Sequence, residues 1–347
     1  MHLNRTKLGA SALGLAALMV LAGCAGGGDS NTGGDASPAP GGEGAKVTHI
    51  TVSVAQNQDI NGLMWSVGRS EGFFEDNGVI VDEVIPAEGG GTTLQNVIAG
   101  KLPFGQVATS ALVKAFNEGL PIRIIAGATQ SPYEIGWGVA ADSEFKTIKD
   151  LENATWGFTG PGSVTEAMSY LVPLHAGLDM DKVKRASTGG VGAGIALLQA
   201  GDVDVTFTPP LVELEQAKDL RVVVHSSEFV PVYGNTMIVS SRDYAAKNPE
   251  VARGLLQGSL EAVEWIKANP EKAADMYAKS VEVDTAAALE VIKAYIEEDL
   301  WGLAFNPEAL ESVAEGLKYT DGLETVDWKG LLTDEFLPEG KKGQIPG

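Results

Sequence analysis

The sequence is poor in the residues that build disulfides and metal sites. Its 347 residues include one cysteine and four histidines. With a single thiol the chain cannot form an internal disulfide. No pair of histidines follows a His-x-x-x-His or other metal-binding spacing; they are His2, His49, His175 and His225. We therefore predict no metal site and expect the last three histidines to have structural roles.

Basic residues are also scarce. The chain has 25 lysines and arginines against 46 aspartates and glutamates, a formal net charge of −21 at pH 7. This balance argues against nucleic acid and anionic lipid headgroups as partners, because both are bound through a basic face. It does not restrict a small ligand, whose site can differ in sign from the protein as a whole.

No convincing catalytic motif is present. Residues Gly68–Gly72 match the letters of a nucleophile elbow, Gly-x-Ser-x-Gly, but they lie in a helical pattern. An elbow needs a strand before the serine and a helix after it. The run Gly189–Gly194 does not fit the dinucleotide fingerprint Gly-x-Gly-x-x-Gly. We therefore predict no catalytic residues, no cofactor and a protein that is not an enzyme.

The first 24 residues have the layout of an export signal. Two basic residues precede an apolar stretch, Leu8–Leu21, that is too short to span a bilayer comfortably. Small residues follow it, which predicts a signal peptide over residues 1–23. Leu21–Cys24 resembles the bacterial lipoprotein box. The resemblance implies that Cys24 becomes the lipidated first residue of a protein anchored at the cell membrane, on its extracytoplasmic face.

A low-complexity segment follows the cysteine. Ala25–Lys46 is rich in Gly, Ser, Asp and Pro and has almost no large apolar residue, so it cannot bury enough surface to order itself. In the flexible regime its ends would lie roughly 25 Å apart. We predict a lipidated tether over residues 24–46, and a folded protein from Val47 that is long enough for two lobes.

From Val47 onward, strands alternate with helices, which predicts an α/β fold with mainly parallel sheets. One helix is expected over Leu63–Asp76, ending at Asn77-Gly78. After Asn235 the composition predicts long amphipathic helices, three of which begin with Asn-Pro-Glu, at Asn248, Asn269 and Asn306. The strands are expected at Ile50–Val54, Val79–Ile85, Phe104–Val107, Ile122–Ala128, Gly136–Ala141, Ala154–Thr159 and Val203–Phe207.

Turns rich in Gly, Ser and Thr occur where expected strands end and helices begin. They are Glu88–Thr93, Ala108–Ser110, Thr159–Thr165 and Thr188–Gly192. Free backbone N–H groups at helix starts favour a carboxylate, sulfonate or phosphate without a lysine or arginine. In an open α/β sheet such turns gather at the carboxyl edge, where ligands bind. For any single turn, ordinary helix capping is the better explanation, but four of them favour a shared cleft.

The order and spacing of these motifs resemble the solute-binding proteins of the nitrate, sulfonate, taurine and thiamine-precursor ABC importers. The motifs are the Gly-rich turn with Leu94–Gly100, Thr147–Leu151, Gly160–Ser163, Gly189–Gly201 with Val203-Asp204, and Asn248-Pro249-Glu250. The resemblance implies a type II periplasmic-binding fold that closes on its ligand about a hinge. It also implies a monomer that docks on an ABC permease in the membrane.

The family implies a division into two lobes. The first would combine residues 47–131 with 230–338, the second would cover 132–229, and 339–347 would form a C-terminal tail. Ligand contacts would come from Gln56, Asn57, Trp65, Gly90, Gly91, Thr92, Thr109, Ser110, Tyr133, Gly162, Ser163, Val164, Gly190, Val191, Thr208 and Asn235. Trp137, Tyr233 and Trp301 are further candidates that core packing would explain equally well.

The ligand itself is less well defined. Helix-start turns favour an anionic group, and nearby aromatic rings could enclose an organic body, so we expect a small alkyl or aryl sulfonate or carboxylate. An uncharged pyrimidine or other thiamine precursor is the alternative. Two other classes stay open: a secreted relative of the fungal pyrimidine-synthesising enzyme, which uses a bound pyridoxal cofactor, and a surface lipoprotein that only senses its ligand.

Overall fold

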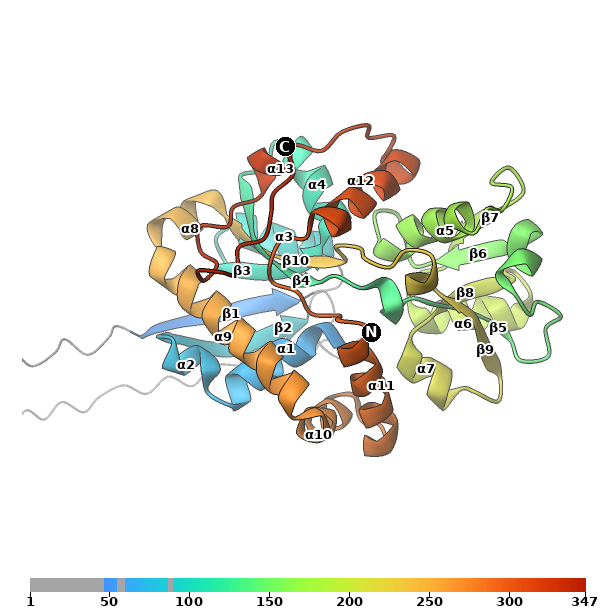
Figure 1. Ribbon diagram of the computed structural model, residues 1–347, viewed down its shortest axis with the longest axis horizontal. Coiled ribbons are helices and arrows are strands. Elements are labelled where there is room, and N and C mark those ends of the chain that lie inside the picture. Colours follow the sequence, from blue (N-terminus) through green and yellow to red (C-terminus); the bar gives the residue numbers. More distant parts are fainter. Residues whose placement is uncertain (1–46, 55–59, 87–89) are drawn as a thin grey trace, which may run out of the picture. The chain divides into compact units, whose positions relative to one another are not determined.

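Two separate five-stranded sheets form the framework of the chain (Figure 1). The computed structural model describes residues 47–54, 60–86 and 90–347, and the strand counts refer to these residues. The first sheet has the order β2-β1-β3-β10-β4 and the second β7-β6-β8-β5-β9. The predicted signal peptide, Cys24, the tether, Gln56 and Asn57 lie outside the described residues.

In each sheet, parallel and antiparallel pairs are equally represented. β1 pairs in parallel with β2 and β3, whereas β10 is antiparallel to β3 and β4. In the second sheet β6 is parallel to β7 and β8, and β5 is antiparallel to β8 and β9. The α/β class is confirmed, but the expectation of mainly parallel sheets is only half correct. The strands are β1 Thr48–Val54, β2 Val79–Pro86, β3 Phe104–Ala108, β4 Ile122–Thr129, β5 Gly136–Ala140, β6 Thr155–Phe158, β7 Lys184–Ser187, β8 Val205–Thr208, β9 Leu220–His225 and β10 Thr236–Ser241.

Helices cover both sheets, and α1, α2 and α9 pack together beside the first (Figure 1). No helix in the described part of the chain is long and apolar enough to cross a bilayer. The helices are α1 Ile60–Ser70, α2 Phe73–Asp76, α3 Gly90–Ile98, α4 Thr109–Asn117, α5 Val164–His175, α6 Val191–Ala200, α7 Pro210–Glu215, α8 Arg242–Lys247, α9 Pro249–Ala268, α10 Pro270–Val281, α11 Thr285–Glu297, α12 Pro307–Asp321 and α13 Trp328–Leu331. Three short 3₁₀ turns are η1 Pro132–Glu134, η2 Ile148–Asn153 and η3 Ser226–Glu228.

The helix expected over Leu63–Asp76 is two helices. Gly72 lies between them with φ = 83°, in the left-handed region that favours glycine. The chain therefore turns after Ser70 and starts α2 at Phe73. Residues Gly68–Gly72 thus span the end of α1, which confirms that they are not the strand-to-helix turn of a nucleophile elbow.

The strand β10 follows Asn235, where the sequence predicts only helices. It lies between β3 and β4, and Met237, Ile238 and Val239 are all buried. A central strand covered on both faces has a short continuous apolar run rather than alternation. Periodicity alone does not separate such a run from a buried helical segment.

The three Asn-Pro-Glu segments do start helices, but only one asparagine caps through its side chain. Asn306 Oδ1 accepts from the Glu308 N–H at 3.0 Å. Asn248 and Asn269 also end the preceding helix, and each side-chain amide donates back to a carbonyl four residues earlier, on Tyr244 and Trp265. At these two sites the asparagine joins consecutive helices instead of capping the next one.

The chain crosses twice between the sheets, from β4 to β5 and from β9 to β10. The two crossovers are hydrogen-bonded to each other: the Tyr233 N–H donates to the Gln130 carbonyl at 2.8 Å, and the Asn235 N–H donates to the Thr129 carbonyl at 3.0 Å. Asn235 Nδ2 also donates to the Ser131 carbonyl at 2.9 Å. This pairing holds the crossovers side by side.

Helix α12 makes a further connection, because it packs on α5 of the second sheet as well as on α4. The Tyr170 and Tyr319 rings stack with centroids 6.0 Å apart. A Cβ atom added at Gly316 would lie 3.1 Å from the Ala167 Cβ, so the two helices approach closely there. The strands of the first sheet come from residues 48–129 and 236–241, and those of the second from 136–225.

Candidate binding site

A chain of hydrogen-bonded polar side chains crosses the end of the first sheet. Gln106, in β3, donates to the Thr236 hydroxyl at 2.9 Å and to Asn61 Oδ1 at 3.1 Å. The Thr236 hydroxyl, at the start of β10, lies 2.7 Å from Thr129 Oγ1, at the end of β4. We call Asn61, Gln106, Thr129 and Thr236 the polar ladder. No sequence motif marks these residues, because each is a single polar side chain in or beside an apolar segment.

Trp65, a predicted ligand contact, is an internal support of this ladder. Its indole N–H donates to Gln106 Oε1 at 2.6 Å, and its fully buried ring stacks on Phe74 at 5.9 Å between centroids. Trp65 therefore orients the Gln106 amide from behind. In the structure its one polar atom is already satisfied by the protein.

Four rings form a continuous aromatic run next to the ladder. Trp301 meets Tyr295 edge-on, with centroids 6.3 Å apart, and Tyr295 meets Tyr133 edge-on at 5.9 Å. Tyr133, in the first crossover, stacks on His225 at 4.6 Å. The rings come from the loop after α11, from α11, from the crossover and from the end of β9. This run, from Trp301 to His225, joins elements of the first sheet to the second.

The start of α4 carries polar atoms without partners. Thr109 and Asn235 are both fully buried, and the Thr109 N–H donates to the Asn235 carbonyl at 3.1 Å. Thr109 Oγ1 and Asn235 Oδ1 have no hydrogen-bond partner among the described residues. Buried polar atoms are normally paired, so these two atoms lack the partners that such atoms usually have.

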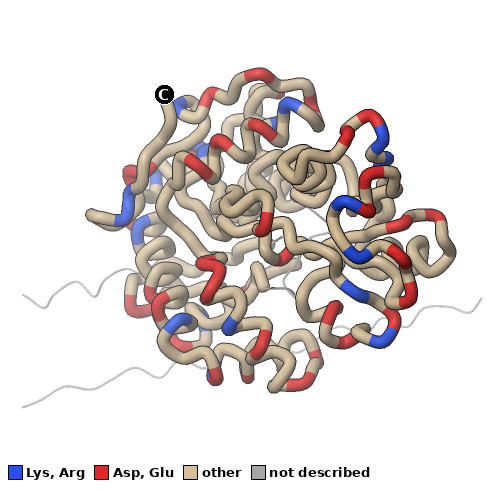
Figure 2. The backbone as a smooth tube through the Cα atoms, turned by 45° about the vertical axis from the view of Figure 1, so that its right-hand side comes forward, with Lys and Arg blue, Asp and Glu red and all other residues tan. Residues whose placement is uncertain are grey.

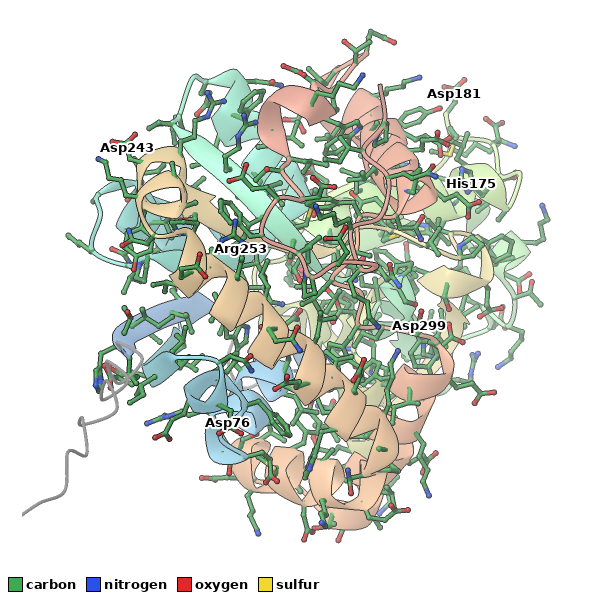
Figure 3. The ribbon with its side chains drawn as sticks, turned by 60° about the vertical axis from the view of Figure 1, so that its left-hand side comes forward. Asp76, His175, Asp181, Asp243, Arg253 and Asp299 are labelled. Atoms are coloured by element: carbon green, nitrogen blue, oxygen red, sulfur yellow. The ribbon has the colours of Figure 1, made fainter. Side chains whose placement is uncertain are left out.

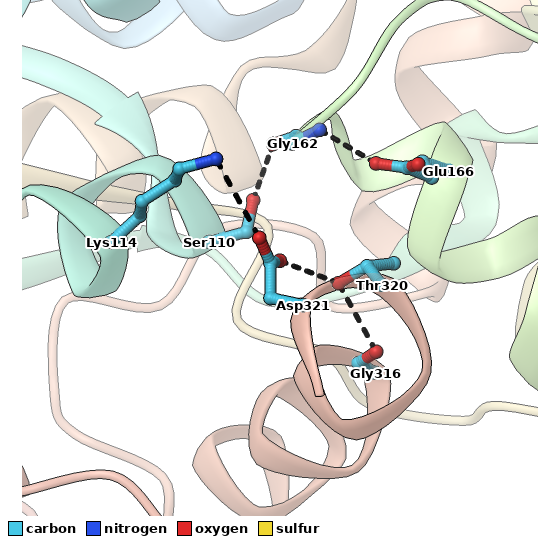
Figure 4. Close-up of polar contacts among 7 residues, drawn as sticks. All are labelled: Ser110, Lys114, Gly162, Glu166, Gly316, Thr320 and Asp321. Atoms are coloured by element: carbon cyan, nitrogen blue, oxygen red, sulfur yellow. Dashed lines mark hydrogen bonds and ion pairs between the residues drawn. The ribbon is translucent and has the colours of Figure 1, made fainter. Parts of the chain in front are cut away.

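Ser110 joins this turn to the second sheet. Its Oγ donates to the Gly162 carbonyl at 2.7 Å, which connects the turn after β3 with the turn after β6 (Figure 4). Beside it, Lys114 of α4 lies 3.7 Å from Asp321 at the end of α12, and Thr320 donates to the same carboxylate at 2.8 Å (Figure 4). The structure thus brings together two turns that the sequence predicts as parts of one site.

Two N–H groups at the start of α5 are already bonded to its own side chains. Ser163 Oγ caps the Glu166 N–H at 3.1 Å, and Glu166 Oε2 accepts from the Gly162 N–H at 2.6 Å. Burial raises the pKa of the Glu166 carboxyl, and Asp321 adds to the rise, while the Gly162 N–H and Lys114 oppose it. An anionic ligand group at this helix start would have to replace a carboxylate that the protein supplies.

The remaining predicted turns differ in burial and in whether their hydroxyl groups are hydrogen-bonded within the protein. Thr188 Oγ1 donates to the Phe158 carbonyl at 3.1 Å, just before Gly190 and Val191 start α6. Thr208 is buried, and its hydroxyl donates to the Thr206 carbonyl at 3.2 Å. Gly90 and Gly91 are the first residues of α3, where Thr92 is exposed. Val164 opens α5 and packs on the core.

Of the further candidates, Trp137 and Tyr233 are fully buried within the protein. The Trp137 indole donates to Ser226 Oγ at 2.9 Å, and its ring packs edge-on against Trp156. Tyr233 lies under α12, where its hydroxyl has no partner among the described residues. Core packing therefore accounts for Trp137, whereas the buried Tyr233 hydroxyl stays unpaired among the described residues.

The three histidines in the described residues lie in structural contacts. His175, at the end of α5 and labelled in Figure 3, faces two acceptors: the Phe229 carbonyl, 2.9 Å from Nδ1, and Glu315 of α12, 3.1 Å from Nε2. His225 likewise faces the Tyr133 carbonyl at 3.2 Å and Glu213 at 3.4 Å. His49 lies 2.9 Å from Asp82.

These contacts favour charged imidazoles at two of the three positions. Burial lowers the pKa of each buried imidazole, but the acceptors on both nitrogens outweigh it and raise the pKa of His175 and of His225 above the usual value. In the described part of the chain, no group of three or more His, Cys, Asp or Glu side chains is arranged to hold a metal ion.

Comparison with known proteins places this geometry in a family. The chain is 25% identical over 211 residues to a formylaminopyrimidine-binding protein of Halalkalibacterium halodurans; the match covers 60% of this chain and 63% of that protein, a little under two thirds. It is 24% identical over 303 residues to a putative binding protein of Brucella abortus, covering 86% of this chain and 88% of that one. It is also 20% identical over 219 residues to a 4-amino-5-hydroxymethyl-2-methylpyrimidine phosphate synthase of Saccharomyces cerevisiae, covering 60% and 64%.

A solved structure supports the same fold. The periplasmic aliphatic sulphonate binding protein of Escherichia coli matches with a TM-score of 0.68 and 18% identity, covering 86% of this chain and 97% of that one. The two-sheet architecture is therefore that of a periplasmic binding protein. The NMT1/THI5-like family model matches residues 59–273, and the chain belongs to the NMT1/THI5-like family.

Proposed function

We propose that this protein is the extracytoplasmic substrate-binding component of an ABC importer. It captures a small organic molecule between the two sheets by closure about the paired crossovers and delivers it, as a monomer, to a membrane permease. The observation that carries the proposal is the direct contact of Ser110 with Gly162, which joins the turns at the carboxyl ends of β3 and β6. In open α/β sheets this edge is where ligands bind.

For the ligand we favour an uncharged heteroaromatic ring of the pyrimidine class over the organic anion that the turns alone suggest. The aromatic run from Trp301 to His225 suits a planar ring. The polar ladder and the unpaired atoms of Thr109 and Asn235 offer neutral donors and acceptors. An anion would meet the Glu166 carboxylate at the start of α5, and the nearby ammonium group, Lys114, is paired with Asp321.

A ligand panel tests this function directly. Thermal unfolding of the purified protein is measured with 4-amino-5-hydroxymethyl-2-methylpyrimidine, other pyrimidines, alkanesulfonates, aromatic carboxylates and nitrate. A ligand at about 100 times its dissociation constant adds roughly 2.7 kcal/mol to the free energy of unfolding, so binding raises the melting temperature measurably. We expect pyrimidines to stabilise the protein. A shift with sulfonates alone contradicts the ligand assignment, and no shift with any organic probe contradicts the function.

The membrane anchor belongs to the same proposal. Lipidation of Cys24 and the tether that follows it would keep the binding domain beside its permease. Cys24→Ala should leave the precursor without a lipid when cells are grown with a radioactive fatty acid. Equal labelling of the variant and the parent protein would contradict the anchor.

The two other classes predict different observations. A secreted enzyme related to the pyrimidine-synthesising protein would convert a bound pyrimidine or require a pyridoxal cofactor, so turnover of a panel compound would favour it. A sensing lipoprotein would be encoded without neighbouring genes for a permease and an ATPase. We favour the importer because the described site has hydrogen-bonding groups and rings but no paired nucleophile and base.

A further inference from the structure

Trp301 carries an indole N–H with no acceptor among the described residues. The side chain is 3% exposed and its Nε1 atom is buried. Three tryptophans that are fully buried are all paired: Trp65 donates to Gln106, Trp137 to Ser226, and Trp156 to the Leu151 carbonyl at 3.3 Å. A buried donor without an acceptor is unfavourable and needs a reason, such as a bound molecule that supplies the acceptor.

The backbone places Trp301 against the polar ladder. Trp301 and Thr129 form an isolated antiparallel bridge. The hydrogen bonds that flank it run from the Gly302 N–H to the Ala128 carbonyl and from the Gln130 N–H to the Leu300 carbonyl, so Thr129 and Trp301 themselves are a pair without mutual hydrogen bonds. In such pairs the two side chains lie on the same face and approach most closely. The indole therefore shares a face with the Thr129 hydroxyl.

The aromatic run fixes the plane of this donor. Trp301 is edge-on to Tyr295, with an interplanar angle of 72°, and Tyr295 is edge-on to Tyr133 at 88°. An indole N–H is a single donor that lies in the plane of its ring and has no acceptor capacity. It can therefore pair only with a lone pair on the bound molecule.

We infer that Trp301 is a specificity-determining contact, whose indole N–H donates to an acceptor atom of the ligand ring: an unprotonated ring nitrogen or a carbonyl oxygen. The inference rests on the proposed function, because it needs a planar ligand beside the polar ladder. A benzene isostere of the same shape would bury the indole N–H without an acceptor. Sites built to satisfy a buried polar group reject analogues that lack its partner far more strongly than sites that distinguish only a methylene group.

A cavity of about 500 Å³ also borders Trp301, on the side of α9, and offers a competing location for the acceptor. Its lining includes Leu260, Val263 and Phe305. Asp299, labelled in Figure 3, also lines it and pairs with Lys267 at 2.5 Å. Seven of its sixteen lining residues carry amide or charged side chains, and Trp301 is the one ring of the aromatic run among them. Leu260→Trp would reduce this cavity without replacing any residue of the polar ladder or the aromatic run.

The experiment is a calorimetric titration of four proteins with two probes. The probes are 4-amino-5-hydroxymethyl-2-methylpyrimidine and its benzene isostere, in which both ring nitrogens are replaced by C–H. The proteins are the parent, Trp301→Phe, Leu260→Trp and Trp137→Phe; the last makes the same chemical change at an indole that is paired with Ser226. Circular dichroism and thermal unfolding establish that each variant is folded.

We expect Trp301→Phe to weaken the pyrimidine about tenfold, the effect of one hydrogen bond to a buried donor, and to leave the isostere unchanged. Trp137→Phe and Leu260→Trp should bind both probes like the parent. In the ¹⁵N-labelled parent, the Trp301 indole proton should move downfield when the pyrimidine binds.

Three outcomes overturn the inference. If Trp301→Phe binds the pyrimidine as tightly as the parent does, the indole N–H does not contact the ligand, and the proposed function is unaffected. If Leu260→Trp no longer binds the pyrimidine, the ligand acceptor lies in the cavity beside α9 and not beside the polar ladder. If the parent binds neither probe, the pyrimidine assignment of the proposed function fails, and the inference fails with it. Because the parent is titrated separately, failure of the contact and failure of the function are distinguished.

Discussion

The two helix starts that meet at the Ser110–Gly162 contact differ in how many of their polar groups are hydrogen-bonded within the protein. At the start of α4, Thr109 Oγ1 is buried without a partner, and the neighbouring Asn235 Oδ1 is also unpaired. At the start of α5, Ser163 accepts from the Glu166 N–H and Glu166 accepts from the Gly162 N–H. Both starts follow a strand of a sheet and both look like anion sites in the sequence. The difference suggests that the first sheet supplies neutral polar contacts to a ligand, while the second presents the negative carboxylate of Glu166.

The acidic character of the protein does not explain this difference. Aspartates and glutamates are spread over the elements of both sheets (Figure 2). The contrast between the two helix starts comes instead from single residues, chiefly the carboxylate of Glu166. Four predictions test it, beginning with the largest expected effect.

Blocking the α5 turn should have the largest effect. Ser163→Phe should abolish ligand binding, because a bulky side chain would stand beside the Ser110–Gly162 contact. Loss of the Ser163 cap should lower the free energy of unfolding by only about 1 kcal/mol, so the variant should still fold. Calorimetry measures the affinity and thermal unfolding the stability. Ser163→Thr keeps the capping oxygen and is the matched control; unchanged affinity in Ser163→Phe would refute the placement of the site.

Removing the unpaired hydroxyl of α4 should have the next largest effect. Thr109→Val keeps the side-chain shape and removes an oxygen that has no partner in the described protein. If a ligand uses this oxygen, affinity should fall about five- to tenfold while stability is unchanged or slightly higher. Thr208→Val is the control, because the Thr208 hydroxyl is paired with the Thr206 carbonyl and its loss should cost stability instead. If Thr109→Val loses stability but keeps its affinity, Thr109 is not part of the site.

Neutralising the α5 carboxylate should have a smaller effect that depends on the probe. Glu166→Gln should leave the affinity for an uncharged pyrimidine nearly unchanged. It should strengthen any weak binding of an alkanesulfonate, because the negative group that opposes an anion at this helix start is removed. Glu152→Gln, at a half-buried carboxylate that is paired with Lys182 away from the site, controls for the change in net charge. If a sulfonate binds Glu166→Gln more weakly than it binds the parent, the Glu166 carboxylate does not repel anions at this helix start.

The pH dependence of stability should show the smallest effect. The pKa values of His175 and His225 are raised in the folded protein. Their stabilising contribution is therefore complete below the unfolded value of about 6.5 and is lost as pH rises through the folded pKa values. The melting temperature should fall as the pH rises above about 6.5 for this reason. In His175→Gln, which lacks the contact with Glu315, the fall should be shallower; an unchanged profile would contradict the charged assignment.

Local patterns in the sequence predicted much of the framework. Strands such as β3 and β4, and the starts of α9, α10 and α12, come from apolar runs and Asn-Pro-Glu signals that act over a few residues. The split of the first long helix was missed because Gly72 reads equally well inside or between helices. Strand β10 was missed because its partners, β3 and β4, lie more than a hundred residues earlier in the chain.

The site was harder to predict than the framework. The turns around Thr109, Ser110 and Gly162 could be identified because glycine and hydroxyl residues mark helix starts. The polar ladder and the aromatic run could not, because Gln106, Thr236 and Trp301 gain their roles only from neighbours distant in sequence. The filling of the α5 start by Glu166 likewise depends on a side-chain rotamer that no spacing rule specifies.

The most direct test of the account is a competition between the two ligand classes on the parent protein. Calorimetric titrations at pH 7 with 4-amino-5-hydroxymethyl-2-methylpyrimidine and with an alkanesulfonate of similar size give two dissociation constants under identical conditions. The neutral polar ladder and the Glu166 carboxylate together predict that the pyrimidine binds at least about tenfold more tightly than the alkanesulfonate, a difference of roughly 1.4 kcal/mol. Tighter binding of the alkanesulfonate would contradict the account.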